Sequence, residues 1–255
     1  MNAAERHARR ILGRLSSADR AAVSASPKEA LASLFSLLIR PEPALAERRG
    51  ADGWCDGMSF LDDGVVLYVP TPYSRRENFT LVHELAHKLA EDDEDALDWI
   101  ADCNDPGREL ERLCDRVAAE LLIPDAIVTH VLGSQPPAAA HLRALYDASA
   151  ASEPVCAIAL ARRLPCQGGV VIMDVGTRTV VYASVASPDE DGWPLAYPWP
   201  HQEIPAHHQL PRLKSGQAAR ERSWWQTPWG ERQDYYLDAV SGTRRVHAVL
   251  AARDL

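Results

Sequence analysis

The chain has 255 residues, a net charge of −9 and 46% hydrophobic residues, which allows one large domain or two smaller domains with a buried core. The acidic balance excludes a protein that is basic overall and coats nucleic acid. Five cysteines, with no C-x-x-C pair among them, favour reduced thiols and a cytoplasmic protein. No stretch is apolar enough for a signal peptide or a membrane span, so we expect neither.

The charge is distributed unevenly along the chain. From residue 206 onward, eight Lys and Arg outnumber five Asp and Glu, whereas the part before it is strongly acidic. Such asymmetry predicts two parts with different partners.

The first forty residues read as helices, at residues 3–15 and 26–39. Ser26 is the expected N-cap of the second helix, with Pro27 at its first position. Residues 58–70 then predict two short strands around an Asp-Asp-Gly turn.

Two longer helices are expected at about 75–90 and 106–122, the second ending before Pro124. Three short helices follow, at 125–133, 138–149 and 152–164. The last two have the lengths of a helix-turn-helix, but few basic residues accompany them, so ordinary helical packing is the favoured interpretation.

From about residue 165 the sequence becomes β-rich. Residues 168–186 and 234–252 each predict a hairpin, and a Pro- and Trp-rich connection begins after the first. We therefore predict an α+β protein with a mainly helical first domain at 1–165, whose helical extension occupies about 125–165. A small antiparallel-sheet domain is expected at 166–255.

Two histidines stand four residues apart in the helix at 75–90, in the sequence His83-Glu84-Leu85-Ala86-His87. Side chains at this spacing share a helix face, which suits two imidazoles that bind one zinc ion. Glu84 can reach a water at the metal without being a ligand, as in the H-E-x-x-H arrangement of zinc peptidases. The competing interpretation is three polar residues on an exposed helix, which the apolar flanks of this segment disfavour.

The helix at 106–122 offers a third ligand. Glu111 can bind the metal, and Asp115, one turn later, can accept the free ring N–H of a ligand histidine. Glu109 competes for the ligand role, but it lies on another side of the helix and has no aspartate one turn beyond it. Glu111 is therefore favoured.

The segment RENFTLVHELAHKLA, followed about twenty residues later by ELERLCDRVAAELLIP, resembles the ImmA/IrrE metallopeptidases. The resemblance covers about residues 75–124. It implies a zincin-like core with one zinc per chain, bound by His83, His87 and Glu111, and Glu84 as the base. It also implies that the sheet domain is similar to GAF domains. Many relatives carry a glutamate where this chain has Leu113, which leaves Glu111 as the ligand in this motif.

Many members of that family cleave a partner helix-turn-helix repressor and so switch on a stress or DNA-damage operon. The resemblance therefore implies a zinc-dependent endopeptidase whose substrate is such a repressor, triggered by a signal sensed at the C-terminal domain. The alternative is a catalytically silent regulator that keeps the zincin-like core as a binding module; the presence of Glu84 favours the enzyme. Tyr73, Arg76 and His130 remain open as the second electrophile.

Two features near the metal motif have a plain interpretation and a functional one. The acidic run at 91–95 is expected to be a solvated turn, or else a negative rim that attracts a basic substrate. Cys103 lies between the two motif helices. It is either an incidental loop cysteine or an inhibitory thiolate on the zinc.

A basic, tryptophan-rich segment stands near the C-terminus. Cations interleaved with aromatic rings can hold single-stranded DNA, whereas the alternative is a sheet core with a solvated basic edge. A small-molecule activator is a third option, and no membrane partner is expected. The candidate DNA-binding residues are Arg212, Lys214, Arg220, Arg222, Trp224 and Trp225.

Overall fold

A computed structural model describes residues 3–48, 57–71, 74–186, 198, 200–226 and 232–252. The chain divides into two compact units, residues 1–125 with 149–152, and residues 126–148 with 153–255. The fold is α+β, as expected from the sequence. In the part of the chain that is described, no helix is both long and apolar enough to cross a membrane.

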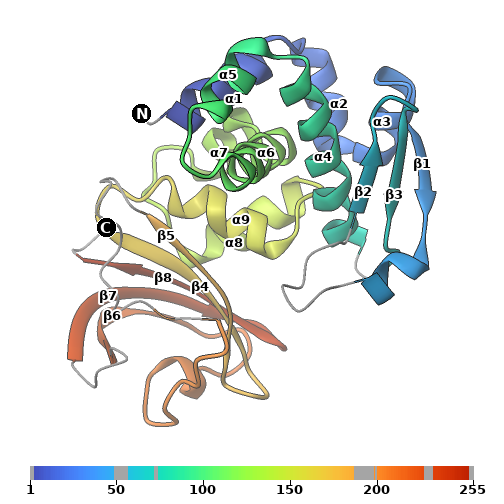
Figure 1. The fold of residues 1–255 in the computed structure, drawn as a ribbon. Helices are drawn as coiled ribbons and strands as arrows, with labels where there is room; N and C mark the ends of the chain where they lie inside the picture. Colours follow the sequence, from blue (N-terminus) through green and yellow to red (C-terminus); the bar gives the residue numbers. More distant parts are fainter. Residues whose placement is uncertain are drawn as a thin grey trace. The chain divides into compact units, whose positions relative to one another are not determined.

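The first unit combines six α-helices, among its described residues, with a three-stranded sheet (Figure 1). The helices are α1 (Ala3–Gly13), α2 (Ser17–Ala25), α3 (Pro27–Leu34), α4 (Ser74–Glu91), α5 (Glu94–Ala101) and α6 (Pro106–Leu122). The strands are β1 (Leu38–Pro41), β2 (Gly57–Phe60) and β3 (Val65–Tyr68), in the order β1-β3-β2. β1 pairs parallel to β3, and β2 pairs antiparallel to it, as the Asp-Asp-Gly turn predicts.

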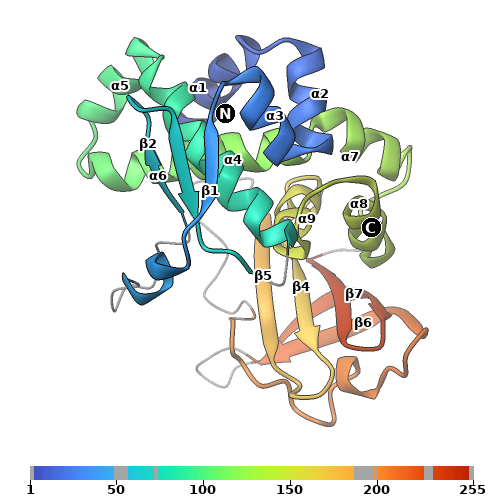
Figure 2. The same cartoon turned by 90° about the vertical axis from the view of Figure 1, so that its right-hand side faces the viewer.

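Helix α4 is held in place from two sides. It packs against α6 and against strands β2 and β3 (Figure 2). Its residues Leu81, Val82 and Leu85 are buried, as are Leu113 and Val117 of α6. Two amphipathic helices that bury their apolar stripes against each other bring the polar residues at the seam together. The fold thereby places the two sequence motifs side by side.

The helix expected at 26–39 ends earlier than predicted. Ser26 and Pro27 occupy the expected positions, although the Ser26 side chain makes no capping hydrogen bond. α3 stops at Leu34, Ser36 adopts a left-handed conformation with φ of 54°, and β1 begins at Leu38. Pairing with β3 thus overrides the local helical preference of the last residues.

Helix α5 was not predicted, because its beginning coincides with the acidic run. Asp93 is 5% exposed and caps α5 by accepting a hydrogen bond from the Ala96 N–H at 2.9 Å. Arg10 of α1 forms ion pairs with Asp93 and Asp95. The solvated-turn interpretation was therefore wrong for Asp93, which is a structural residue between α1 and α5.

The second unit is a five-stranded antiparallel sheet with three helices among its described residues. The strands follow the order β5-β4-β8-β7-β6. Their bounds are β4 (Gly168–Asp174), β5 (Val180–Ala186), β6 (Ala218–Gln226), β7 (Arg232–Ser241) and β8 (Arg245–Ala251). The helices are α7 (Asp125–Leu132), α8 (Ala139–Ala148) and α9 (Glu153–Ala161).

The two faces of this sheet are packed differently. One face buries an apolar cluster that includes Met173, Trp225 and Leu237. On the other face, α8 packs against β7 and β8, and α9 packs against β4 and β5 (Figure 1). The division of the chain thus differs from the boundary expected near residue 165. Two of the three helices expected to extend the first domain, α8 and α9, pack against the sheet.

Candidate metal centre

Helix α4 presents His83 and His87 on one face, one turn apart. Their ring centroids are 4.9 Å apart, and the two Nε2 atoms face each other at 3.2 Å. The side chains are 15% and 19% exposed, so both rings are sheltered while their Nε2 edges meet.

Helix α6 brings Glu111 to the same point. Its Oε2 lies 3.1 Å from His83 Nε2, and its Oε1 lies 3.4 Å from His87 Nε2. Among the described residues, these three side chains form a group whose ligand atoms all lie within 4.8 Å of one another. Glu111 is 59% exposed, which leaves the group open to solvent on its side.

The three ligand atoms fit a zinc ion. Zinc binds nitrogen and oxygen at about 2.0–2.1 Å in a tetrahedron, so two of its ligand atoms stand roughly 3.3 Å apart. The 3.2 Å between the two Nε2 atoms matches that spacing, and Glu111 places Oε2 3.1 Å from His83 Nε2 and Oε1 3.4 Å from His87 Nε2. Three protein ligands with solvent access correspond to a catalytic site, because structural zinc sites use four protein ligands.

Asp115 lies behind the first histidine. Its Oδ1 is 3.0 Å from His83 Nδ1. The two atoms are in close contact, but their geometry is not that of an aligned hydrogen bond. Burial by itself would lower the pKa of His83, but Asp115, then Glu111 and Glu84, outweigh burial and raise it. Such a carboxylate fixes the ring orientation and leaves Nε2 for the metal.

Glu84 lies on the same helix beside the histidines, and it is not part of the ligand group. It is 8% exposed. Its Oε2 accepts a hydrogen bond from the Ser59 hydroxyl of β2 at 2.6 Å. A Cβ at Gly57 would lie 2.8 Å from Glu84 Oε1 and 2.6 Å from Thr80 Cγ2, so glycine is what allows β2 to approach α4.

Sequence reasoning missed the contribution of Ser59 and Gly57. The signal was present in the predicted strand, because alternation along β2 turns both residues to one face and Met58 with Phe60 to the other. The sequence pattern does not show that this face of β2 packs against α4.

Three further side chains of the motif region stay outside the ligand group. Glu109 pairs with Arg112 at 2.8 Å, as expected for a residue on another side of α6. Cys114 is fully buried, and burial, followed by the nearby carboxylates, raises the pKa of its thiol, so it remains protonated. Cys103 Sγ donates to the Trp99 carbonyl at 3.3 Å, and the structure does not bring it into the ligand group.

The three candidates for a second electrophile lie in different parts of the chain. Tyr73 lies outside the described residues. Arg76 is exposed on α4, and His130 is exposed on α7 of the second unit. His130 is not part of the ligand group.

The basic, tryptophan-rich segment forms part of the sheet of the second unit. Arg212, Lys214, Arg220 and Arg222 are exposed. Trp225 is 2% exposed and belongs to the apolar core, where its Nε1 donates to Gln202 at 3.2 Å.

Trp224 points to the opposite face of β6. It stacks on His207 with ring centroids 5.5 Å apart, and the Arg232 guanidinium lies 5.6 Å from its ring centroid. The period of two along a strand separates the adjacent tryptophans. The sheet-core alternative therefore applies to Trp225, and its assignment as a DNA-stacking residue was wrong.

Comparison with known proteins bears on the first unit above all. The family described as IrrE N-terminal-like domain, peptidase M78, matches residues 55–152. The radiation response metalloprotease IrrE of Deinococcus radiodurans is 32% identical over 83 residues. That alignment covers 31% of this chain and 25% of IrrE, so the chain spans about a quarter of the length of this curated relative.

A solved structure of a Mycobacterium tuberculosis transcriptional regulator aligns with 97% of this chain and 73% of its own, at 13% identity and a TM-score of 0.48. The matched family region contains the ligand group and Glu84. Residues 55–152 of this chain, which include His83, Glu84, His87 and Glu111, are thus similar to the IrrE N-terminal-like domain family, peptidase M78.

Proposed function

We propose that the protein is a zinc-dependent endopeptidase that cleaves a partner helix-turn-helix repressor. The observation that carries the proposal is the ligand group His83, His87 and Glu111, with Glu84 beside it on α4. The name of its relative IrrE, a radiation response metalloprotease, supports a peptidase activity. The repressor substrate rests on the family resemblance.

The side chains at this centre have separate tasks. A bound zinc ion would supply Lewis-acid activation of a water molecule and of the substrate carbonyl. His83, His87 and Glu111 would hold the ion, and Asp115 would fix the His83 ring. Glu84 accepts the proton of the attacking water and delivers it to the leaving amine.

Ser59 holds the base in position. Its hydroxyl donates to Oε2 of Glu84, which limits the rotation of the carboxylate. A short hydrogen bond to a carboxylate is among the stronger ones in proteins. Gly57 allows this contact, because a side chain there would occupy the space of Glu84 and Thr80.

The architecture of both units enters the proposal by resemblance. We assign a zincin-like core to the first unit and a GAF-like sensor to the sheet of the second. The sensor would receive a stress or DNA-damage signal and release the peptidase. One candidate trigger is single-stranded DNA on the exposed cations Arg212, Lys214, Arg220 and Arg222, with Trp224 as the aromatic partner.

The proposal is tested by co-expression with a helix-turn-helix protein encoded beside this chain. Wild-type protein should cut the partner at one bond, seen on gels and located by mass spectrometry. Glu84→Gln should retain zinc and lose cleavage, since a positioned base contributes about 10²–10⁴ to the rate. Glu109→Gln, a change on α6 outside the ligand group, is the control. Equal cleavage by Glu84→Gln would remove Glu84 as the base, and no cleavage of the partner by the wild type would favour a catalytically silent regulator.

A further inference from the structure

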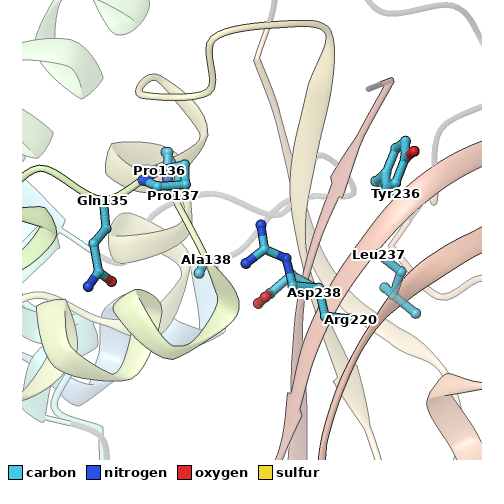
Figure 3. Close-up of a pocket in the computed structure, with 8 residues that line it drawn as sticks. All are labelled: Gln135, Pro136, Pro137, Ala138, Arg220, Tyr236, Leu237 and Asp238. Atoms are coloured by element: carbon cyan, nitrogen blue, oxygen red, sulfur yellow. The ribbon is translucent and has the colours of Figure 1, made fainter. Parts of the chain in front are cut away.

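The pocket that residues 135–138 and strands β6 and β7 line in the second unit has no charge preference (Figure 3). Its volume is about 300 Å³. Arg220 and Asp238, which carry opposite charges, both line it, and Asp238 Oδ1 accepts a hydrogen bond from the Ala139 N–H at 2.7 Å. The pocket therefore does not select a ligand by charge. A surface with a clearer chemical character lies in the first unit.

The three-stranded sheet of the first unit packs one face against helices. Ser59 of β2 donates to Glu84 of α4 at 2.6 Å, and the Tyr68 hydroxyl of β3 accepts from Lys28 Nζ of α3 at 3.1 Å. Val66, two residues before Tyr68 and therefore on the same face, is fully buried. We call this the inner face of the sheet and the opposite one the outer face.

The outer face of this sheet is apolar. The strand register places six side chains on it in two rows, Leu38, Val65 and Phe60, followed by Arg40, Leu67 and Met58. Leu38 is 48% exposed and Phe60 is 46% exposed. The solvated face of a sheet ordinarily carries polar side chains, and an exposed apolar patch marks an interaction site. The outer face is therefore suited to contact with another protein.

The size of the outer face fits one helix. Three strands about 4.8 Å apart give a surface roughly 10 Å wide, and an α-helix with its side chains is about 10–12 Å across. A stable interface between two protein copies uses about 20–30 residues per partner, whereas this face offers six side chains. A single amphipathic helix matches the face better than a second copy of the chain does.

The charges around the outer face favour a helix in one direction. Asp62 and Asp63, in the turn that joins β2 to β3, are exposed beyond the row that contains Phe60. Arg40 is exposed in the other row. A helix has a positive N-terminus and a negative C-terminus. A helix along the strands, with its N-terminus at the two aspartates and its C-terminus at Arg40, would be stabilised at both ends.

Strand β2 joins the outer face to the proposed catalytic residues. Phe60 and Met58 lie on the outer face, and Ser59 between them contacts Glu84 on the inner face. We propose that the outer face binds one amphipathic helix of the protein that this peptidase cleaves. The helix presents apolar side chains at positions i, i+3, i+4 and i+7. This inference rests on the proposed function and deepens it by naming a docking surface for the substrate.

Binding is measured by calorimetry with the zinc-loaded, full-length Glu84→Gln protein, which holds the partner without cutting it. The probe is the helix-turn-helix protein encoded beside this chain. Leu38→Glu and Phe60→Glu, each added to that background, should weaken binding about tenfold or more, because a charge replaces an apolar contact at the centre of the interface. Leu97→Glu, at a leucine on α5 that is 40% exposed, is the matched control and should bind with the affinity of the background protein.

Cleavage kinetics separate docking from support of the active site. The two substrates are the whole partner and a short peptide that contains only the cleaved bond and its neighbours. With Glu84 intact, Leu38→Glu and Phe60→Glu should lower kcat/KM for the whole partner at least about tenfold more than for the peptide, since only the whole partner reaches the outer face. The loss should lie in KM.

Each other outcome has a defined meaning. Unchanged binding by Leu38→Glu and Phe60→Glu, equal losses for partner and peptide, or no binding of the partner at all would overturn the docking surface. A dimer of the free protein that Phe60→Glu dissociates, seen by sedimentation, would assign the face to a second copy instead. Binding that depends on the outer face, with no cleavage of either substrate by the wild type, would overturn the peptidase function and keep the helix-binding surface.

Discussion

At the scale of single residues, Glu111 is the proposed ligand that joins the two motif helices. It lies 3.1 Å from His83 Nε2 and 3.4 Å from His87 Nε2 while remaining 59% exposed. Two histidines on one helix do not by themselves make a tight zinc site, since the third ligand completes the coordination. The ligand role of Glu111 is therefore open to a direct test.

We predict that Glu111→Ala weakens zinc binding by at least about 100-fold, since even groups behind the ligands contribute 10–100-fold. Competition with a chromogenic chelator measures this affinity. Glu109→Ala, which changes a glutamate paired with Arg112 on the same helix, should retain zinc. Full zinc content in the Glu111 variant would remove this residue from the coordination sphere.

Ser59 should affect the chemistry and leave metal binding unchanged. We predict that Ser59→Ala lowers kcat about ten- to a hundredfold, because a hydrogen bond to a charged group contributes about 1.5–3 kcal/mol. KM and zinc content should stay at their wild-type values. Ser59→Thr keeps the hydroxyl and should recover most of the rate. A loss of zinc, or a change confined to KM, would contradict a role in orienting Glu84.

At the scale of elements, strand β6 combines an apolar face with a basic one. The neighbouring residues Trp224 and Trp225 point to opposite faces, so the strand contributes to the core and to the surface at once. The same alternation directs Arg220 and Arg222 to the solvent side.

We predict that Trp225→Ala lowers the free energy of unfolding by about 3–5 kcal/mol, the usual effect of removing a large buried aromatic side chain. Trp224→Ala should lower it by less than half as much, because Trp224 is only partly buried. Denaturant titration of the two variants measures the difference. Equal losses would mean that both rings support the core.

His208 connects the segment that precedes β6 to that strand by hydrogen bonds, and it is 2% exposed. Its Nε2 donates to the Trp224 carbonyl at 2.9 Å, and its Nδ1 accepts from the Leu210 N–H at 3.2 Å. Burial lowers the pKa of His208. The folded protein therefore favours the neutral ring, because a protonated Nδ1 could no longer accept the Leu210 N–H.

The stability contribution of His208 should depend on pH in a defined direction. The unfolded chain binds the proton more readily, so the contribution is complete above pH 6.5, the ordinary pKa of histidine, and is lost as pH falls. We predict that the free energy of unfolding decreases from pH 8 to pH 5 more in the wild type than in His208→Gln. His130→Gln, at an exposed position, should keep the wild-type slope; identical slopes for all three proteins would contradict the prediction.

At the scale of the whole molecule, the proposed metal centre and the sheet core belong to different compact units. The proposed ligands lie in residues 1–125, and the apolar cluster around Trp225 lies in the second unit. A ligand stabilises the part of the protein whose folded state it binds. Zinc should therefore act on the two units unequally.

We predict that removing zinc with a chelator accelerates hydrogen exchange in α4 and α6 and leaves β4 and β8 nearly unchanged. At a zinc concentration of 100 times Kd, the stabilisation lost is about 2.7 kcal/mol, which corresponds to roughly a hundredfold faster exchange in globally protected amides. Exchange followed by mass spectrometry resolves the segments. Equal acceleration in β4 and β8 would show that the two units unfold together.

The sequence alone determined the elements with strong local signals and the chemistry that they carry. The helices at the metal motif, the turn at residues 62–64 and both hairpins follow from hydrophobic periodicity, a proline stop and turn residues. The spacing of His83 and His87 places their rings on one helix face. The pairing of α4 with α6 could be anticipated because a zinc site needs a third ligand.

Tertiary structure decided what depends on contacts between distant segments. Ser59 became a partner of Glu84 because β2 packs on α4, and Asp93 became a buried cap because Arg10 of α1 approaches it. Residues 38–41 became a strand because β3 offers backbone partners, against a local preference for helix. Trp225 entered the core because β7 gives β6 its register. In each case the deciding energy comes from burial and pairing between segments far apart in the sequence, which local patterns do not contain.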